Sequence, residues 1–209
     1  MGKMLNERKP LKGSSWWGIL VFAILILIDQ TTKIAAEIFL KDGKEIFILS
    51  DWITLKLVYN RGISYGLGDD ASPWVKLCVI GATAVIMLIL TIAYFCTDKR
   101  RGCLRTAFVF VVAGGVGNLI DRLYYKVWKA GGLLGVRDMV NVSRFGFAVC
   151  NFADFFITAG AIMLVLSFLF FDRDAFFPVG KYKTLQKEMK DKEEELAKQK
   201  EEKKAQKNG

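Results

Sequence analysis

Four long apolar runs limit the folds open to this 209-residue chain. They cover about residues 16–40, 74–95, 104–123 and 155–171, and a helix needs about 17–25 apolar residues to cross a bilayer. A large soluble helical core is the alternative, but a chain of this length rarely spaces four such runs with so few charges inside them. Charged residues make up 24% of the chain and lie mostly outside the runs. The sequence therefore predicts a mainly α membrane protein with four transmembrane helices.

Charge divides the chain into three parts. Residues 1–15 form a short basic N-terminus, residues 16–172 hold the four predicted spans, and residues 173–209 form a charged tail. A basic segment before an apolar run is also typical of a secretory signal peptide. This run is too long for one, and three more spans follow it. We therefore expect it to be retained as the first transmembrane helix.

The basic residues also predict the orientation in the membrane, because cytoplasmic loops carry an excess of Lys and Arg. Such residues precede the first span, gather at 99–105 and enrich the tail, so both termini are expected to be cytoplasmic. The loop 41–73, with five acidic and four basic residues, suits the outer side. The net charge of +9 then reflects topology and affinity for anionic membrane lipids. No nucleic-acid-binding motif accompanies it, and no nucleic-acid partner is expected.

One strand is predicted between the first two spans. Residues 53–60 alternate with a period of two, with Ile53, Leu55, Leu57 and Tyr59 on one face. Residues that tolerate positive φ follow at 60–68. The spacing favours a β-hairpin with its turn. The alternative is a small extracytoplasmic β-sheet on the membrane surface, with Asn60 directed at a substrate backbone.

The residue types exclude several chemistries. The chain has no histidine, which removes the Ser-His and Cys-His nucleophile pairs, the usual zinc ligands and the commonest general base. The four cysteines form no C-x-x-C pair, and three fall in or near predicted spans, which argues against a disulfide scaffold or a metal site. Neither a metal nor another cofactor is expected. For hydrolysis, paired carboxylates are the natural candidates.

Polar side chains within the spans are costly in hydrocarbon unless they are paired. Asp29 and Lys33 lie four residues apart on one helical face, which favours a structural ion pair. In the third span Asn118, Asp121 and Arg122 also share a face, and the last two could form an ion pair that ends the helix.

Two further aspartates lie near the last span. Asp138 follows Val136-Arg137, and Asp154 is a good N-cap for the last span, with help from Asn151. Under the predicted topology, eight polar residues project to the same outer interface: Asp29, Asn60, Asn118, Asp121, Arg122, Asp138, Asn151 and Asp154. One shared polar site explains this arrangement better than several independent accidents.

Two other classes of function remain open from these residues. A small ion-coupled transporter also carries intramembrane Asp and Asn. Against it, the polar residues cluster at one boundary and no internal repeat is visible. A structural membrane subunit is the other alternative, and it would tolerate Asp138→Asn.

Five ordered segments closely resemble the motifs of bacterial lipoprotein signal peptidases (signal peptidase II). They are Asp29-Gln30-Thr31-Thr32-Lys33, Asn60-Arg61-Gly62-Ile63-Ser64-Tyr65-Gly66, Gly114-Gly115-Val116-Gly117-Asn118-Leu119-Ile120-Asp121-Arg122, Val136-Arg137-Asp138-Met139-Val140 and Asn151-Phe152-Ala153-Asp154. The resemblance covers about residues 16–172. It implies a four-helix aspartyl protease of the bacterial cytoplasmic (inner) membrane. Such an enzyme removes the signal peptide from diacylglyceryl-modified prolipoproteins, cleaving just before the lipidated cysteine.

The resemblance also implies roles for particular residues. Asp138 and Asp154 would be the catalytic pair. The residues expected to bind substrate or support the site are Asp29, Lys33, Asn60, Gly62, Gly114, Asn118, Asp121, Arg122 and Asn151. Two close carboxylates share one proton, so one would activate a water and the other would protonate the carbonyl oxygen. Asp154, at a helix N-terminus, is the expected ionised member.

The chain departs from the family pattern in three places. Ala113 replaces a glycine that often begins the third motif, Ser64-Tyr65 replaces a small residue and Phe, and the connection from Arg122 to Asp138 is long. One chain holds every expected site residue, so a monomer is expected.

Overall fold

The computed structural model describes residues 16–62, 71–99, 101–129, 134–172 and 174–207, with side chains up to 199. Five α-helices and three strands follow one another in these segments. In chain order they are α1 (Trp16–Phe39), β1 (Glu45–Leu49), β2 (Ile53–Asn60), α2 (Pro73–Cys96), α3 (Gly102–Tyr124), β3 (Val136–Asn141), α4 (Phe152–Leu169) and α5 (Lys181–Lys207). Short 3-10 helices lie at Lys41–Gly43 and Ser143–Phe145.

Helices α1 to α4 are each long and apolar enough to cross a membrane. Their bounds agree with the predicted spans to within a few residues, which confirms the mainly helical membrane fold. Their outer faces carry exposed large apolar residues such as Leu27 and Leu88. An exposed apolar face of this size marks the surface that the bilayer covers.

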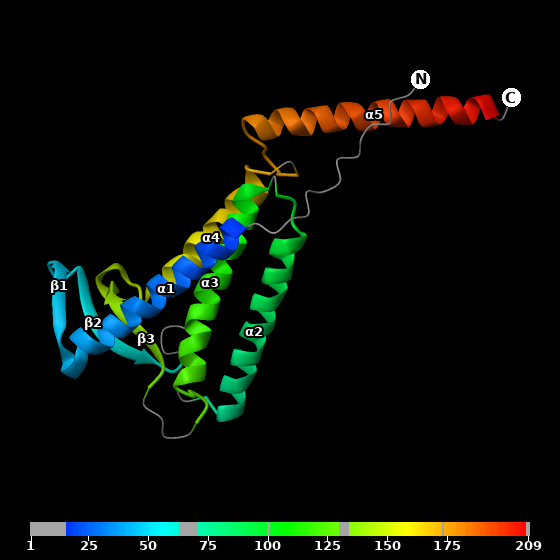
Figure 1. Ribbon diagram of the computed structural model, residues 1–209. Coiled ribbons are helices and arrows are strands. Elements are labelled where there is room, and N and C mark those ends of the chain that lie inside the picture. Colours follow the sequence, from blue (N-terminus) through cyan, green and yellow to red (C-terminus); the bar gives the residue numbers. More distant parts are fainter. Residues whose placement is uncertain (1–15, 63–70, 100, 130–133, 173, 208–209) are drawn as a thin grey trace.

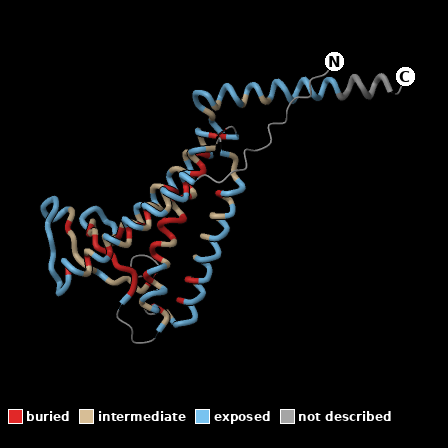
Figure 2. The backbone as a smooth tube through the Cα atoms, viewed as in Figure 1, coloured by how far each residue is buried: buried red, intermediate tan, exposed pale blue. Residues whose placement is uncertain are grey.

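Helix α3 lies at the centre of the bundle and packs against α1, α2 and α4. Buried residues gather along it (Figure 2). The contact with α4 depends on Gly114, where an added Cβ would lie 2.3 Å from the carbonyl oxygen of Ala153. A glycine at this position is therefore what allows α4 to pack closely on α3.

The three strands form one antiparallel sheet in the order β1-β2-β3. Strand β2 forms its hairpin with the preceding β1, and Ser50 takes the positive φ in the turn. Its other edge pairs with β3, where Val58 faces Asp138 and Asn60 faces Val136. The strand prediction is therefore confirmed. The favoured hairpin turn after Asn60 is wrong, because the second edge of β2 takes its partner from the connection between α3 and α4.

The sheet and the charged helix α5 lie at opposite ends of the bundle (Figure 1). The α2–α3 turn and the segment after α4 meet at the α5 end, where Arg101 Nε is 2.6 Å from Asp172 Oδ2. Two of the basic segments identified in the sequence therefore share one end. The tail is helical over the range given for α5, and Ser64-Tyr65 lies outside the described residues.

Candidate active site

The sheet, the lower part of α3 and the start of α4 bring the predicted site residues together at one end of the bundle (Figure 1). Helix α1 supplies two of them, and two more lie at the last residue of β2 and just after this strand. The others come from α3, β3 and the start of α4. By element they are Asp29 and Lys33; Asn60 and Gly62; Gly114, Asn118, Asp121 and Arg122; Asp138; and Asn151 and Asp154.

Two asparagine side chains connect the two aspartates of the predicted pair. Asn151 Nδ2 donates to Asp138 Oδ1 at 2.6 Å and to Asn118 Oδ1 at 3.1 Å. Asn118 Nδ2 in turn donates to Asp154 Oδ1 at 2.8 Å. Asn60 Nδ2 donates to the second oxygen of Asp138 at 3.2 Å. Each carboxyl group is thus oriented by side-chain amides that belong to other elements.

Asn151 is the N-cap of α4, and Asp154 occupies the third helical position. The Asn151 side chain accepts from the Asp154 backbone N–H at 3.2 Å, and Asp154 Oδ2 accepts from the Asn151 backbone N–H at 3.0 Å. This reciprocal pair is a capping box. The expectation that Asp154 itself is the cap is therefore wrong. Its carboxylate is still held at the helix N-terminus, where the helix dipole favours negative charge.

Asp138 lies in a different electrostatic environment. Its side chain is buried, with only 3% of the residue exposed. Burial and the nearby charge of Asp154 raise the pKa of Asp138 to about 7, although the hydrogen bonds from Asn151 and Asn60 act in the opposite direction. Asp138 therefore keeps its proton to a much higher pH than an ordinary carboxyl group, beside a carboxylate held by a capping box.

Both aspartates line one cavity of about 570 Å³. Asn60, Asn118 and Arg122 share its polar side. The rest of the wall is apolar and comes from β3, α4 and the loop between them, through Phe145, Phe147, Val149, Phe155 and Ile157. The cavity thus joins an acid–base pair to a surface suited to apolar substrate groups.

A buried ion pair between Lys33 and Asp29 holds Asn118 in place. Lys33 Nζ donates to Asp29 Oδ2 at 2.9 Å and to Asn118 Oδ1 at 3.0 Å, with both charged side chains almost fully buried. Asp29 Oδ1 accepts from the backbone N–H of Ala153 at 3.0 Å. The predicted ion pair is confirmed, and it fixes both Asn118 and the first turn of α4.

Asp121 pairs with Arg137, and not with Arg122 as the sequence suggested. Asp121 Oδ1 accepts from Arg137 Nη2 at 2.7 Å, and Oδ2 accepts from the backbone N–H and Nε of Arg137 at 3.0 and 3.2 Å. Arg122 instead donates to the carbonyl oxygens of Gly62 at 3.1 Å and Asn118 at 3.3 Å. Asp121 therefore holds the residue directly before Asp138, and Arg122 ties the end of β2 to α3.

Four residues that support the site were not among the predicted site residues: Glu37, Tyr59, Tyr125 and Arg137. Glu37 accepts from Arg137 Nη1 at 2.9 Å, from Tyr59 Oη at 2.9 Å and from the hydroxyl of Tyr125. Burial and the hydrogen bond to Glu37 raise the pKa of Tyr59 to about 12, so its hydroxyl stays a donor. Glu37 lies one turn beyond Lys33 on the same helical face, and that periodicity was the available signal.

Within the described residues, no three Cys, Asp or Glu side chains are placed to hold a metal ion. The four cysteines are all free thiols.

The chain is similar to several known proteins over most of its length. A family model described as signal peptidase (SPase) II matches residues 21–170. A protein of Burkholderia ambifaria named lipoprotein signal peptidase is 35% identical over 174 residues, which cover 79% of this chain and 93% of that protein. A protein of the same name from Fusobacterium nucleatum is 29% identical over 163 residues, covering 77% and 91%.

A solved structure described as a bacterial membrane enzyme has the same fold, with a TM-score of 0.58 over 75% of this chain and 89% of that one, at 23% identity. The four apolar helices are those of a multi-pass bacterial membrane protein. On the match over most of its length and the similarity to these relatives, the chain belongs to the signal peptidase II family.

Proposed function

We propose that this protein is an aspartic endopeptidase that removes the signal peptide from diacylglyceryl-modified prolipoproteins, cleaving just before the lipidated cysteine. The observation that carries the proposal is the pair Asp138 and Asp154, joined through Asn118 and Asn151 at the polar side of the cavity. The relatives named lipoprotein signal peptidase support the substrate class. A peptidase family also favours this function over a transporter or a structural subunit.

The two aspartates divide the acid–base work between them. Asp154, held at the N-terminus of α4, is the ionised member that takes a proton from the attacking water. Asp138, whose pKa is raised to about 7, is the acid that protonates the carbonyl oxygen as the tetrahedral intermediate forms. The proton taken by Asp154 then passes to the leaving amine as the C–N bond breaks, and a hydroxyl of the intermediate returns its proton to Asp138, which restores both carboxyl groups. The side chains supply every proton transfer, and no covalent intermediate forms.

The supporting residues preserve this division. Asn60, Asn118 and Asn151 orient both carboxyl groups, and the Asp29–Lys33 pair fixes Asn118. The apolar wall of the cavity takes the acyl chains of the substrate, which enters laterally from the bilayer. One chain acting as a monomer suffices for this mechanism.

The same proposal places the site at the outer face of the membrane and both termini in the cytoplasm. It rests on the gathering of basic segments at the end of the bundle opposite the aspartates. A reporter fused after Lys207 is expected to behave as internal, and one inserted near Asp70 as external. The reverse pattern would overturn the placement.

The deciding experiment incubates the purified chain in detergent with a lipidated prolipoprotein and with its unlipidated form. Mass spectrometry of the products is expected to show a cut before the modified cysteine in the lipidated substrate alone. Activity in detergent, without sealed vesicles, also separates a protease from a transporter. Cleavage of neither substrate by a stably folded protein, or a cut at another position, would contradict the proposal.

A further inference from the structure

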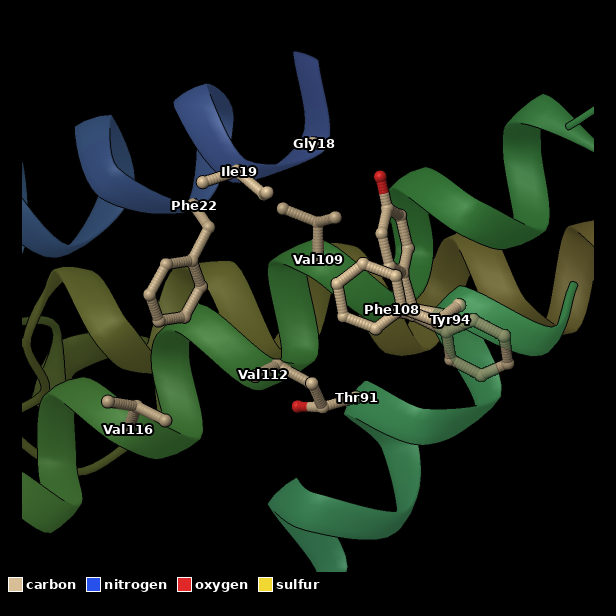
Figure 3. Close-up of a pocket in the computed structure, with 10 residues that line it drawn as sticks. Gly18, Ile19, Phe22, Thr91, Tyr94, Phe108, Val109, Val112 and Val116 are labelled. Atoms are coloured by element: carbon tan, nitrogen blue, oxygen red, sulfur yellow. The ribbon is translucent and has the colours of Figure 1, made fainter. Parts of the chain in front are cut away.

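A second cavity lies between α1, α2 and α3 and shares no lining residue with the cavity of the aspartates. Helices α1 and α2 both pack on α3, and a cavity of about 210 Å³ remains between them. Figure 3 shows Phe22 of α1, Thr91 of α2 and Val112 of α3 around it. Its lining is almost wholly apolar, and the one side-chain hydroxyl besides that of Tyr94 belongs to Thr91, which donates to the carbonyl of Met87 at 2.7 Å.

This apolar cavity continues into a basic one at the end of the bundle. A neighbouring cavity of about 230 Å³ shares Gly18, Tyr94 and Val109 with the first. Its lining includes Lys99 and Arg105, and none of its described lining residues carries a carboxylate. The lining of this basic cavity comes from the start of α1, the end of α2 and the start of α3, which are the helix ends nearest α5 in Figure 1.

Arg105, in the basic cavity, is a buried cation whose hydrogen bonds are incompletely satisfied. It is 6% exposed, and its guanidinium lies 4.3 Å from the centre of the Tyr94 ring. Nη1 donates to the carbonyl of Thr97 at 3.0 Å, whereas Nη2 is buried and has no hydrogen-bond partner in the described part of the chain. A buried guanidinium N–H without an acceptor is costly, because its hydration is lost and nothing replaces it. The site therefore lacks an anionic or carbonyl oxygen.

The junction of the two cavities is closely fitted. A Cβ at Gly18 would lie 2.0 Å from Tyr94 Oη, so only glycine lets α1 approach this ring. Figure 3 shows the Tyr94 hydroxyl directed toward Gly18. The ring thus stands between the apolar cavity and Arg105, with one face against the guanidinium. At the edge, Ile19 and Phe95 are 42% and 50% exposed, so the cavity borders the lipid-facing surface.

We propose that this end of the bundle binds one anionic glycerophospholipid of the bilayer, with its phosphate at Lys99 and Arg105 and one acyl chain in the apolar cavity. A phosphate oxygen supplies the acceptor that Arg105 lacks, and both cations favour negative charge. The acyl chain fills a space that water does not occupy favourably. The bordering lipid-facing residues give the lipid a lateral entrance. This site lies at the opposite end of the bundle from the aspartates, so the proposal does not depend on the proposed function.

Native mass spectrometry of the full chain in detergent tests the proposal, by titration with phosphatidylglycerol and phosphatidylcholine of identical acyl chains. The wild type is expected to bind one phosphatidylglycerol molecule about tenfold more tightly than phosphatidylcholine, because a hydrogen bond to a charged group contributes about that factor in affinity. Arg105→Gln and the exposed Lys99→Gln should each reduce that preference. Val112→Phe should weaken the binding of both lipids, because the larger side chain fills the cavity. Lys44→Gln, which removes one exposed charge near the sheet, is the matched control and should change neither.

Several outcomes would overturn the proposal. Equal affinity of the wild type for the two lipids would exclude a phosphate-selective site. Unchanged binding by a folded Val112→Phe would exclude the apolar cavity. Competition by millimolar inorganic phosphate as effective as that by the lipid would show a free-anion site without an acyl chain. If Arg105→Gln fails to fold, Arg105→Lys takes its place. Lys99→Gln still tests the phosphate position, and Val112→Phe still tests the apolar cavity.

Discussion

The variant Asp121→Asn should distinguish residues that position the catalytic pair from the residues that carry out proton transfer. Asp121 is fully buried and accepts three hydrogen bonds from Arg137. Removal of one partner of a buried ion pair costs about 3–5 kcal/mol. In this variant Arg137 still has its ion pair with Glu37 at 2.9 Å. We therefore expect the free energy of unfolding to fall by about 3 kcal/mol, the lower end of that range. For a chain of this size this corresponds to a fall in Tm of about 6–12 °C.

The activity of Asp121→Asn should fall but not vanish. Arg137 directly precedes Asp138 in β3, so a shift of this strand displaces the acid while both carboxyl groups of the pair remain. Small misplacements of catalytic groups cost up to about a hundredfold in rate, and we expect about tenfold in kcat. The assay is cleavage of the lipidated prolipoprotein well below the Tm of the variant. Asp172→Asn is the control, because it weakens the pair of the buried Asp172 with the partly exposed Arg101 at the far end and should lower Tm without lowering kcat.

A double-mutant cycle that combines Asp121→Asn with Arg137→Gln tests whether the two side chains are coupled. Removal of both charges leaves no unpaired buried ion between these positions. The double variant should therefore be at least about 1 kcal/mol more stable than the sum of the single effects predicts. Additive losses would show that the two side chains are not coupled, and the assignment of Asp121 as the support of β3 would fail.

Three further predictions follow from the geometry. Gly114→Ala places a Cβ 2.3 Å from the Ala153 carbonyl and should lower both Tm and turnover by pushing α4 away, whereas Gly81→Ala, with nothing within 4 Å, should change neither. Because the pKa of Asp138 rises from 3.8 to about 7 on folding, its contribution to stability is complete at low pH and is lost as the pH rises through about 7. Asp138→Asn should remove that part of the pH dependence of Tm. Truncation after Val179 should leave turnover in detergent within a few-fold, because α5 extends away from the bundle (Figure 1); complete loss of activity in a stably inserted protein would contradict this.

Periodic features could be predicted from the sequence. Apolar runs long enough for a bilayer leave few alternatives to helices, and the alternation at 53–60 identified β2. The i, i+4 spacing of Asp29 and Lys33 placed them on one face, where they do pair. Local spacing within a helix is enough for such statements, because neighbouring turns must be adjacent in space.

Contacts between distant segments could not be read in the same way. Strand β3 pairs with β2 across two helices, and only that pairing brings Asp138 beside Asn60. Asp121 has Arg122 as its sequence neighbour, but adjacent residues on a helix point in different directions, and the packing of β3 supplies Arg137 instead. The same limit hid the basic cavity at Arg105, since its lining comes from three helices.

The central claim is that Asp138 and Asp154 perform the chemistry, and single-turnover cleavage of a lipidated prolipoprotein by Asp138→Asn and Asp154→Asn tests it most directly. Asparagine keeps the shape of aspartate but cannot act as an acid or base, so each variant should lose about a hundredfold or more in rate while remaining inserted and folded. Near-normal turnover by Asp138→Asn together with complete inactivity of Asp121→Asn would contradict the account. The catalytic pair would then be Asp121 and Asp154.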